Sequence, residues 1–193
     1  MTSLGHTKSA IVPAPVQQCF DAVHAHAAHL PQLQALAIQI QHNLQYQHAW
    51  SDLHVHTHSP LTKKPLPRPL VSGLPPQRIY IHPDEQVELL KEADRTRKAT
   101  NAVAESAALH VQAAPEREWI LPTRLNEKWT LRRLAGVFDA ITSVPPSPNA
   151  AVESAHTANP WRTTKRLLLA TADSDSTVVY YIVHDGVVKP RQN

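Results

Sequence analysis

Apolar positions are densest close to the C-terminus of the chain. Two apolar runs, residues 167–170 and 178–183, flank a polar turn, and Asp185 with Gly186 forms a second turn before the valines at 187–188. This pattern predicts a β-hairpin followed by a short return strand. The run at 178–183 places apolar side chains on both faces, so we expect it to be a central strand that is covered on both sides.

Helical periodicity dominates the first fifty residues. Residues 1–14 are polar and are expected to be disordered. Apolar positions then repeat at intervals of three and four over residues 15–30, and again after Pro31 as far as about residue 46, which predicts two helices. Residues 50–58 alternate between apolar and polar side chains and predict a strand at the edge of a sheet.

Prolines crowd residues 59–77, where the chain reads SPLTKKPLPRPLVSGLPPQ. This spacing favours an extended, polyproline-like connector. The motif PLPRP within it is also typical of ligands for an aromatic groove, so a Pro-rich interaction module is kept as an alternative.

The second half of the chain alternates short strands with helices. Acidic residues after Pro83 favour a helix start there, and Thr130 can cap a later helix. The apolar stripe of that later helix consists of Leu131, Leu134, Val137, Phe138 and Ile141. The elements in order are a strand at 78–82, a helix from 83, an exposed helical insertion at 92–115, a strand at 118–122, the helix capped by Thr130 and a loop at 144–164. Together they predict an α/β fold, a mixed β-sheet flanked by helices.

Composition narrows the class of protein. A chain of 193 residues with 17 Pro and 4 Gly is expected to form one domain, here residues 15–193 with its connector, insertion and loop. The single cysteine, Cys19, has no disulfide partner within the chain, and the first residues lack the apolar core of a signal peptide. We therefore expect a soluble intracellular protein. A net charge of +3 permits contact with nucleic acid but does not demand it.

Three histidines share one face of the strand at 50–58. His54, His56 and His58 alternate with apolar positions, and neutral imidazoles in this arrangement could hold zinc. No Cys, Asp or Glu nearby completes the set, and histidine is common in the chain. A metal-binding protein or enzyme built on this face remains an alternative function.

The C-terminal residues also carry a resemblance to a known family. A Lys before an aliphatic run, a turn of Asp and Ser, the sequence VVYY, a DG turn and a final PRQN are similar to the end of the tRNA-splicing endonuclease subunits. The chain resembles in particular their small non-catalytic subunit of the "Sen fifteen" type, in a fungal version. The resemblance implies the α/β fold of the splicing-endonuclease C-terminal domain.

The resemblance also bears on catalysis. Catalytic members use a Tyr, a His and a Lys without metal or other cofactor, and Thr163 to Leu167 of this chain looks like the lysine segment, with Lys165 in the place of the lysine. Matches to the histidine segment and to the tyrosine are missing. Because such cleavage needs both a general base and a general acid, a single lysine does not suffice. The resemblance therefore implies a structural subunit without catalytic residues, and the residues expected to contact RNA are Lys165, Arg166, Arg132 and Arg133.

Partners follow from the resemblance as well. It implies pairing with a catalytic subunit of the "Sen thirty-four" type inside a four-subunit enzyme that excises introns from precursor tRNA. The expected interface consists of Val179, Tyr181, Val183, Gly186, Val187 and Val188. The expected location is the nucleus, with the cytosolic face of the mitochondrial outer membrane as the alternative.

Overall fold

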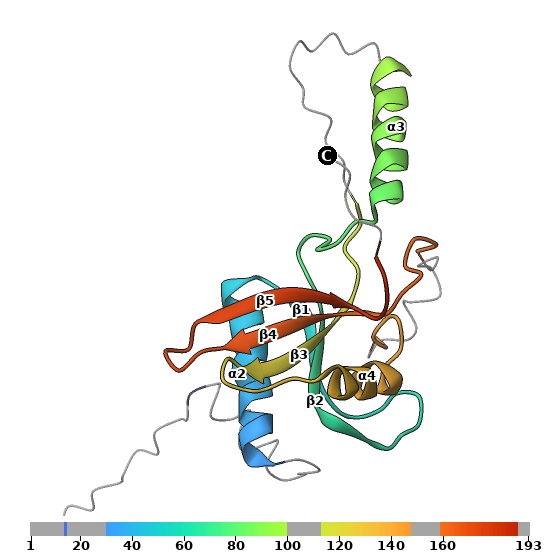
Figure 1. The fold of residues 1–193 in the computed structure, drawn as a ribbon. Helices are drawn as coiled ribbons and strands as arrows, with labels where there is room; N and C mark the ends of the chain where they lie inside the picture. Colours follow the sequence, from blue (N-terminus) through green and yellow to red (C-terminus); the bar gives the residue numbers. More distant parts are fainter. Residues whose placement is uncertain (1–13, 15–29, 100–112, 148–158, 189–193) are drawn as a thin grey trace, which may run out of the picture.

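The protein is built on one mixed β-sheet with helices against both faces (Figure 1). The computed structural model describes residue 14 and residues 30–99, 113–147 and 159–188. Its elements are α2 (Pro31–Gln47), β1 (Ser51–His58), β2 (Pro65–Leu74), α3 (Pro83–Ala99), β3 (Glu118–Arg124), α4 (Leu131–Ala140), β4 (Arg166–Ala172) and β5 (Val178–His184). The predicted α/β fold is confirmed. The predicted disorder at 1–14 and the helix at 15–30 lie almost entirely outside the described residues.

The five strands follow the chain order across the sheet. Neighbouring strands are antiparallel except β3 and β4, which are parallel and are joined through α4. A parallel pair needs such a crossover, because a tight turn cannot reverse the chain direction. The edge strand β1 is irregular, with register shifts on either side of His54 to His56 and a positive φ of 50° at Asp52. The opposite edge strand, β5, pairs with β4 over seven consecutive residues without a shift.

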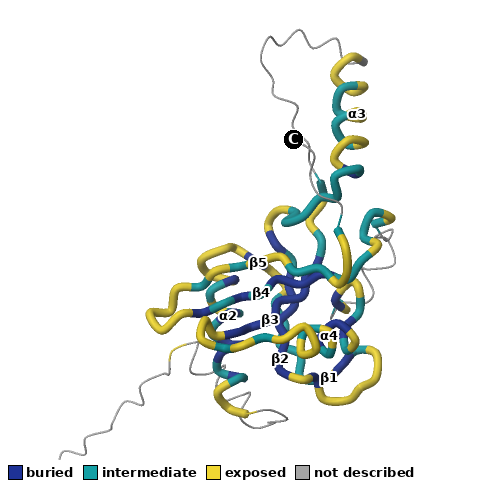
Figure 2. Tube along the Cα trace, viewed as in Figure 1, coloured by how far each residue is buried: buried dark blue, intermediate teal, exposed yellow. Residues whose placement is uncertain are grey.

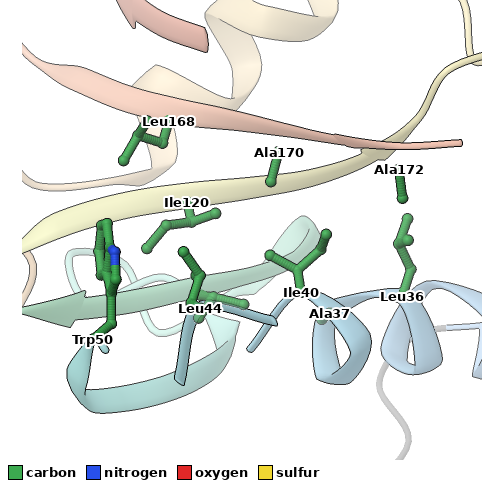
Figure 3. Close-up of a cluster of buried hydrophobic side chains, with 10 residues drawn as sticks. Leu36, Ala37, Ile40, Leu44, Trp50, Ile120, Leu168, Ala170 and Ala172 are labelled. Carbon is green, nitrogen blue, oxygen red and sulfur yellow. The ribbon is translucent and has the colours of Figure 1, made fainter. Parts of the chain in front are cut away.

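Two hydrophobic clusters cover the two faces of the sheet. On one face, α2 inserts Leu36, Ala37, Ile40 and Leu44 against Ile120 and the small side chains of β4 (Figure 3). On the other face, Val137 and Phe138 of α4 pack around Trp119. The middle strands are accordingly the most deeply buried part of the chain (Figure 2). Thr130 caps α4 as expected, its Oγ1 accepting a hydrogen bond from the Arg133 amide at 3.3 Å. Leu131, predicted to belong to the apolar stripe, is 87% exposed.

The Pro-rich segment is not a connector, and that prediction was wrong. Residues 65–74 form β2, an inner strand whose Leu66, Leu70 and Val71 are buried. The prolines are tolerated because β2 pairs with β3 only from Val71 onward, beyond the last proline, so the missing amide donors are not needed on that side. The PLPRP motif is part of the sheet, which speaks against its use as a free ligand for an aromatic groove.

Residues 78–82 do not form the predicted strand. The segment runs without regular structure from β2 to α3, with Ile79 against the first cluster and Arg78 and Tyr80 directed to polar partners. Apolar and polar side chains alternate here because the segment runs between the first hydrophobic cluster on one side and charged side chains, among them Glu85 and Arg166, on the other.

Helix α3 extends away from the sheet (Figure 1). Its second half is exposed and carries ion pairs between residues three and four apart, such as Lys91 with Glu88 and Lys98 with Asp94. Residues 92–99, at the start of the predicted insertion, are thus helical and largely exposed, whereas residues 113–115 at its end have no regular structure. Within the ranges that the structure describes, no helix is long and apolar enough to cross a membrane.

Candidate interaction surface

Strand β5 offers an exposed apolar edge. Val179 is 45% exposed, Tyr181 56% and Ile182 38%, and Val187 beyond the strand is 96% exposed. Each face of the strand is also anchored. On the face of Ile182, Tyr180 packs against the first cluster and donates its hydroxyl to Asn43 Oδ1 at 2.6 Å. On the face of Val179 and Tyr181, Val183 packs against the second cluster. A regular edge with large apolar side chains can accept a strand from another chain.

This placement corrects two predictions for the C-terminal hairpin. The hairpin and its polar turn are as expected, but β5 is an edge strand and is not covered on both faces. The return strand at 187–188 is absent from the described structure, in which Gly186 turns the chain with a φ of 107° and Val187 and Val188 have no strand assignment. The free edge therefore belongs to β5 itself.

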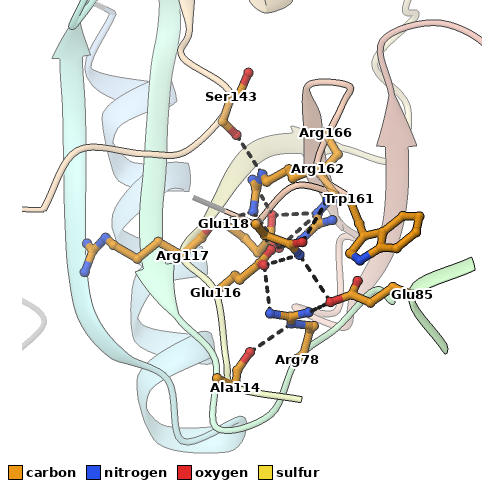
Figure 4. A network of polar contacts seen from close by, with 11 residues as sticks. Arg78, Glu85, Ala114, Glu116, Arg117, Glu118, Ser143, Trp161, Arg162 and Arg166 are labelled. Atoms are coloured by element: carbon orange, nitrogen blue, oxygen red, sulfur yellow. Dashed lines mark hydrogen bonds and ion pairs between the residues drawn. The ribbon is translucent and has the colours of Figure 1, made fainter. Parts of the chain in front are cut away.

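A buried ion-pair cluster lies beside the start of β3 and β4 (Figure 4). Its members are Arg78, Glu85, Glu116, Glu118, Arg162 and Arg166. Arg166 Nε donates to Glu118 Oε1 at 3.0 Å, and Arg162 Nη2 lies 3.0 Å from Glu118 Oε2. Glu116 joins the cluster to the loop before β4, since it accepts from Asn159 Nδ2 at 2.6 Å and from Arg166 Nη2 at 2.7 Å.

The opposite charges in this cluster stabilise one another, as the pKa values of Glu116 and Arg166 indicate. Burial raises the pKa of Glu116, but the Asn159 hydrogen bond and the guanidinium groups of Arg78, Arg166 and Arg162 lower it below its ordinary value overall. Burial likewise lowers the pKa of Arg166, and hydrogen bonds to Glu118 raise it above its ordinary value overall. Three carboxylates and three guanidiniums thus compensate one another. Both shifts favour the ionised forms of Glu116 and Arg166, which suits a structural role for this pair.

A shallow pocket opens beside the cluster and is partly aromatic. His82 stacks on Trp161 with ring centroids 5.8 Å apart, and Tyr80 meets His184 edge to face at 4.7 Å. The pocket is lined by these side chains together with Thr163, Thr164 and the valines after β5. Sequence reasoning missed both the pocket and the cluster, because their members come from four separate segments of the chain.

Comparison with known proteins places the chain among its relatives. The family model described as "Sen15 protein" matches residues 39–193, well over half of the chain. The chain belongs to the Sen15 family. A similar protein from Neurospora crassa, called probable tRNA-splicing endonuclease subunit tsp-1, is 44% identical over 167 residues, which cover 83% of this chain and 67% of that protein. The resemblance seen in the sequence is confirmed.

Within this Sen15 chain, Lys165 has a structural contact. Its Nζ donates to the carbonyl oxygen of Phe138 at 2.7 Å, at the end of α4, and its own carbonyl accepts from the Asp185 amide at 2.9 Å. A lysine at a helix C-terminus stabilises the exposed carbonyls and the negative end of the helix dipole. Lys165 thereby joins α4 to the end of the hairpin.

The four residues expected to contact RNA have different surroundings. Arg166 is 5% exposed and bound to Glu118, and Lys165 is committed to α4, so neither presents a free cation. Arg132 is exposed, and Arg133 is half-exposed while pairing with Glu127 at 2.8 Å. RNA contact stays a prediction, and exposure favours it only for Arg132 and Arg133.

The middle histidine of the three on β1, His56, is engaged in packing and in a hydrogen bond. His56 lies edge to face with Trp119 at 4.9 Å, and its Nε2 is 2.8 Å from Ser72 Oγ. Burial, followed by the charges of His54 and Arg117, lowers its pKa from 6.5 to about 4. Among the residues with described positions, no group of three or more His, Cys, Asp or Glu side chains could hold a metal ion. The comparisons likewise contain nothing that favours the metal-binding alternative.

Proposed function

We propose that this chain is a non-catalytic, structural subunit of the tRNA-splicing endonuclease that cleaves precursor tRNA at its intron boundaries. Family membership and the similarity to the Neurospora protein support the role of a subunit. The observation that carries the structural part of the proposal is the free edge of β5, with the exposed side chains of Val179 and Tyr181.

The occupant proposed for this edge is a strand of a catalytic subunit of the "Sen thirty-four" type, within a four-subunit complex. Backbone hydrogen bonds of a paired strand supply affinity, and alternate side chains supply specificity. On β5 these would be Val179 and Tyr181 on one face and Ile182 on the other, continued by Gly186, Val187 and Val188. Val183 packs in the second cluster and would contribute to this interface by supporting the strand from within the subunit.

The structural contact of Lys165 supports the proposal that this subunit is not catalytic. Its ammonium group holds the Phe138 carbonyl, and the adjacent Arg166 is bound to carboxylates. We expect the isolated chain to leave an intron-containing precursor tRNA intact in the presence of a chelator. Specific cleavage at both splice sites by the isolated chain would overturn the proposal.

Assembly tests the remaining part of the proposal. Co-expression with the catalytic subunit should yield a complex on gel filtration, and a tagged chain should retrieve the other endonuclease subunits from its source cells.

We propose the nucleus as the location of this chain, and the cytosolic face of the mitochondrial outer membrane as the alternative. Imaging of the tagged chain distinguishes these sites.

A further inference from the structure

A basic surface surrounds the first turn of α4. It consists of the side chains of Arg124, Lys128, Arg132 and Arg133, at the end of β3 and the start of the helix, and it is called here the α4 basic surface. Arg124, Lys128 and Arg132 are exposed, and Figure 2 shows the exposed chain that leads from β3 into α4. Residues 124–133 contain these four cations and one acid, Glu127, a net +3 that matches the net charge of the entire chain.

One member of the α4 basic surface, Arg133, is held by a partly buried cluster that includes a distant residue. Arg68 of β2 donates from Nη1 to Glu127 Oε1 at 2.7 Å, and Arg133 Nη2 lies 2.8 Å from the same oxygen. Both guanidinium groups lie over the Trp129 ring, 5.2 and 4.3 Å from its centroid. Arg133 Nη1 also donates to the Lys128 carbonyl at 2.7 Å, which fixes the loop against the helix. These contacts fix the Arg133 side chain and the backbone of the loop that leads into α4.

Positive charge in this cluster exceeds negative charge. The Arg68 side chain is 4% exposed, and two of its nitrogens, Nε and Nη2, are buried without a hydrogen-bond partner among the described residues. The single carboxylate of Glu127 is shared between Arg68 and Arg133. Burial raises the pKa of Glu127, yet the hydrogen bonds from these two arginines bring it down to about 2. A buried cation with an incomplete counter-charge produces a positive field that favours an anion nearby.

We propose that the α4 basic surface binds the phosphate backbone of precursor tRNA. The identity of this RNA rests on the proposed function; the preference for a polyanion rests on the charges alone. Exposed cations need only phosphates as partners, and the positive end of the α4 dipole adds to their attraction. A protein interface would need an apolar centre, whereas exposed apolar side chains of this region are limited to Leu125 and Leu131 within the described structure.

The test removes three charges and leaves the buried cluster intact. The variant carries Arg124→Ala, Lys128→Ala and Arg132→Ala. A matched control carries Lys91→Ala, Arg95→Ala and Lys98→Ala on α3, where the three side chains are 57%, 72% and 72% exposed. Both variants lose the same net charge, so a difference between them reports position and not total charge.

Binding of precursor tRNA is measured for the isolated full chain and for the assembled complex, at several salt concentrations. The α4 variant should bind roughly 10- to 100-fold more weakly near physiological salt, and its slope of log K against log salt should fall by about 2 to 3. The α3 control should stay within a few-fold of the wild-type chain. Equal affinities and slopes for the two variants would overturn the proposal.

Assembly is scored separately by gel filtration. If the α4 variant fails to join the catalytic subunit while its isolated chain binds RNA like the wild type, the surface is a protein interface and the proposal is wrong. If the wild-type chain does not assemble at all, the proposed function fails; the comparison of isolated chains still decides whether the α4 basic surface binds RNA.

Discussion

Replacing Tyr181 by alanine should weaken assembly and leave the stability of the isolated chain almost unchanged. Tyr181 lies on the exposed face of β5 and is 56% exposed, so few of its contacts are lost within the subunit. Its neighbour Tyr180 is the natural comparison. Tyr180 lies on the same strand, packs against the first cluster and donates a hydrogen bond from its hydroxyl to Asn43 of α2.

The expected loss of binding free energy for Tyr181→Ala follows from the area of the tyrosine side chain that a partner could cover. Aromatic side chains bury about 150–250 Å² each, so the exposed part of Tyr181 amounts to roughly 110 Å². At about 25 cal/mol per Å², and with a discount for the hydroxyl, covering this area contributes about 2 kcal/mol to binding. Loss of that contribution raises Kd by roughly 30-fold. For Tyr180→Ala, by contrast, the cost falls on folding, at about 3 kcal/mol.

The assay titrates each variant against the catalytic subunit and records urea unfolding of each isolated chain. We expect Tyr181→Ala to shift Kd with an unchanged unfolding midpoint, and Tyr180→Ala to lower the midpoint. Tyr180→Phe serves as a milder control, because it removes only the hydrogen bond to Asn43. An unchanged Kd for Tyr181→Ala, or a loss of stability equal to that of Tyr180→Ala, would refute the assignment of β5 as the docking edge.

Three further substitutions or conditions probe the interior. Lys165→Ala removes the donor to the Phe138 carbonyl and should cost about 1–2 kcal/mol of unfolding free energy, while cleavage by the assembled complex changes less than a few-fold. A thousandfold loss in the chemical step with assembly intact would show that this subunit supplies a catalytic group. Lowering the pH from about 7 to about 5 should cost roughly 2 kcal/mol, because the unfolded chain protonates His56 below pH 6.5 while the folded chain resists protonation down to about 4; unfolding of His56→Gln should lack this part of the pH dependence. Glu118→Gln leaves Arg166 with an incomplete counter-charge and should destabilise the chain by about 3 kcal/mol in thermal or urea unfolding, whereas a loss below about 1 kcal/mol would contradict the role of the cluster.

The fold was predictable wherever a single segment carries its own signal. The period of three and four after Pro31 predicted α2, Thr130 predicted the start of α4, and the two apolar runs predicted the hairpin. These signals are local, since helix caps and side-chain periods depend on neighbours in the chain.

The errors arose where the partner of a segment decides its structure. Prolines argue against an inner strand, yet β2 forms because its proline-containing half lacks β3 as a neighbour. Apolar residues on both faces of 178–183 argue for a buried strand, yet a docking edge has the same composition. The cluster around Arg166 and the contact of Arg68 with Glu127 join residues that are 48 and 59 positions apart. A single sequence contains no local sign of such pairs.

The two edges of the sheet differ in a way that limits how copies of this chain can combine. The bulged edge at β1 twists its backbone groups out of register, which is how natural sheets discourage further strand pairing. Of the two edges in the described sheet, β5 alone offers a straight row of donors and acceptors. A chain with a single competent edge can end a sheet but cannot propagate it, because fibre growth requires two. We therefore expect strand pairing through β5 to stop after one neighbour, with the irregular β1 edge discouraging open-ended polymerisation of the unassembled subunit.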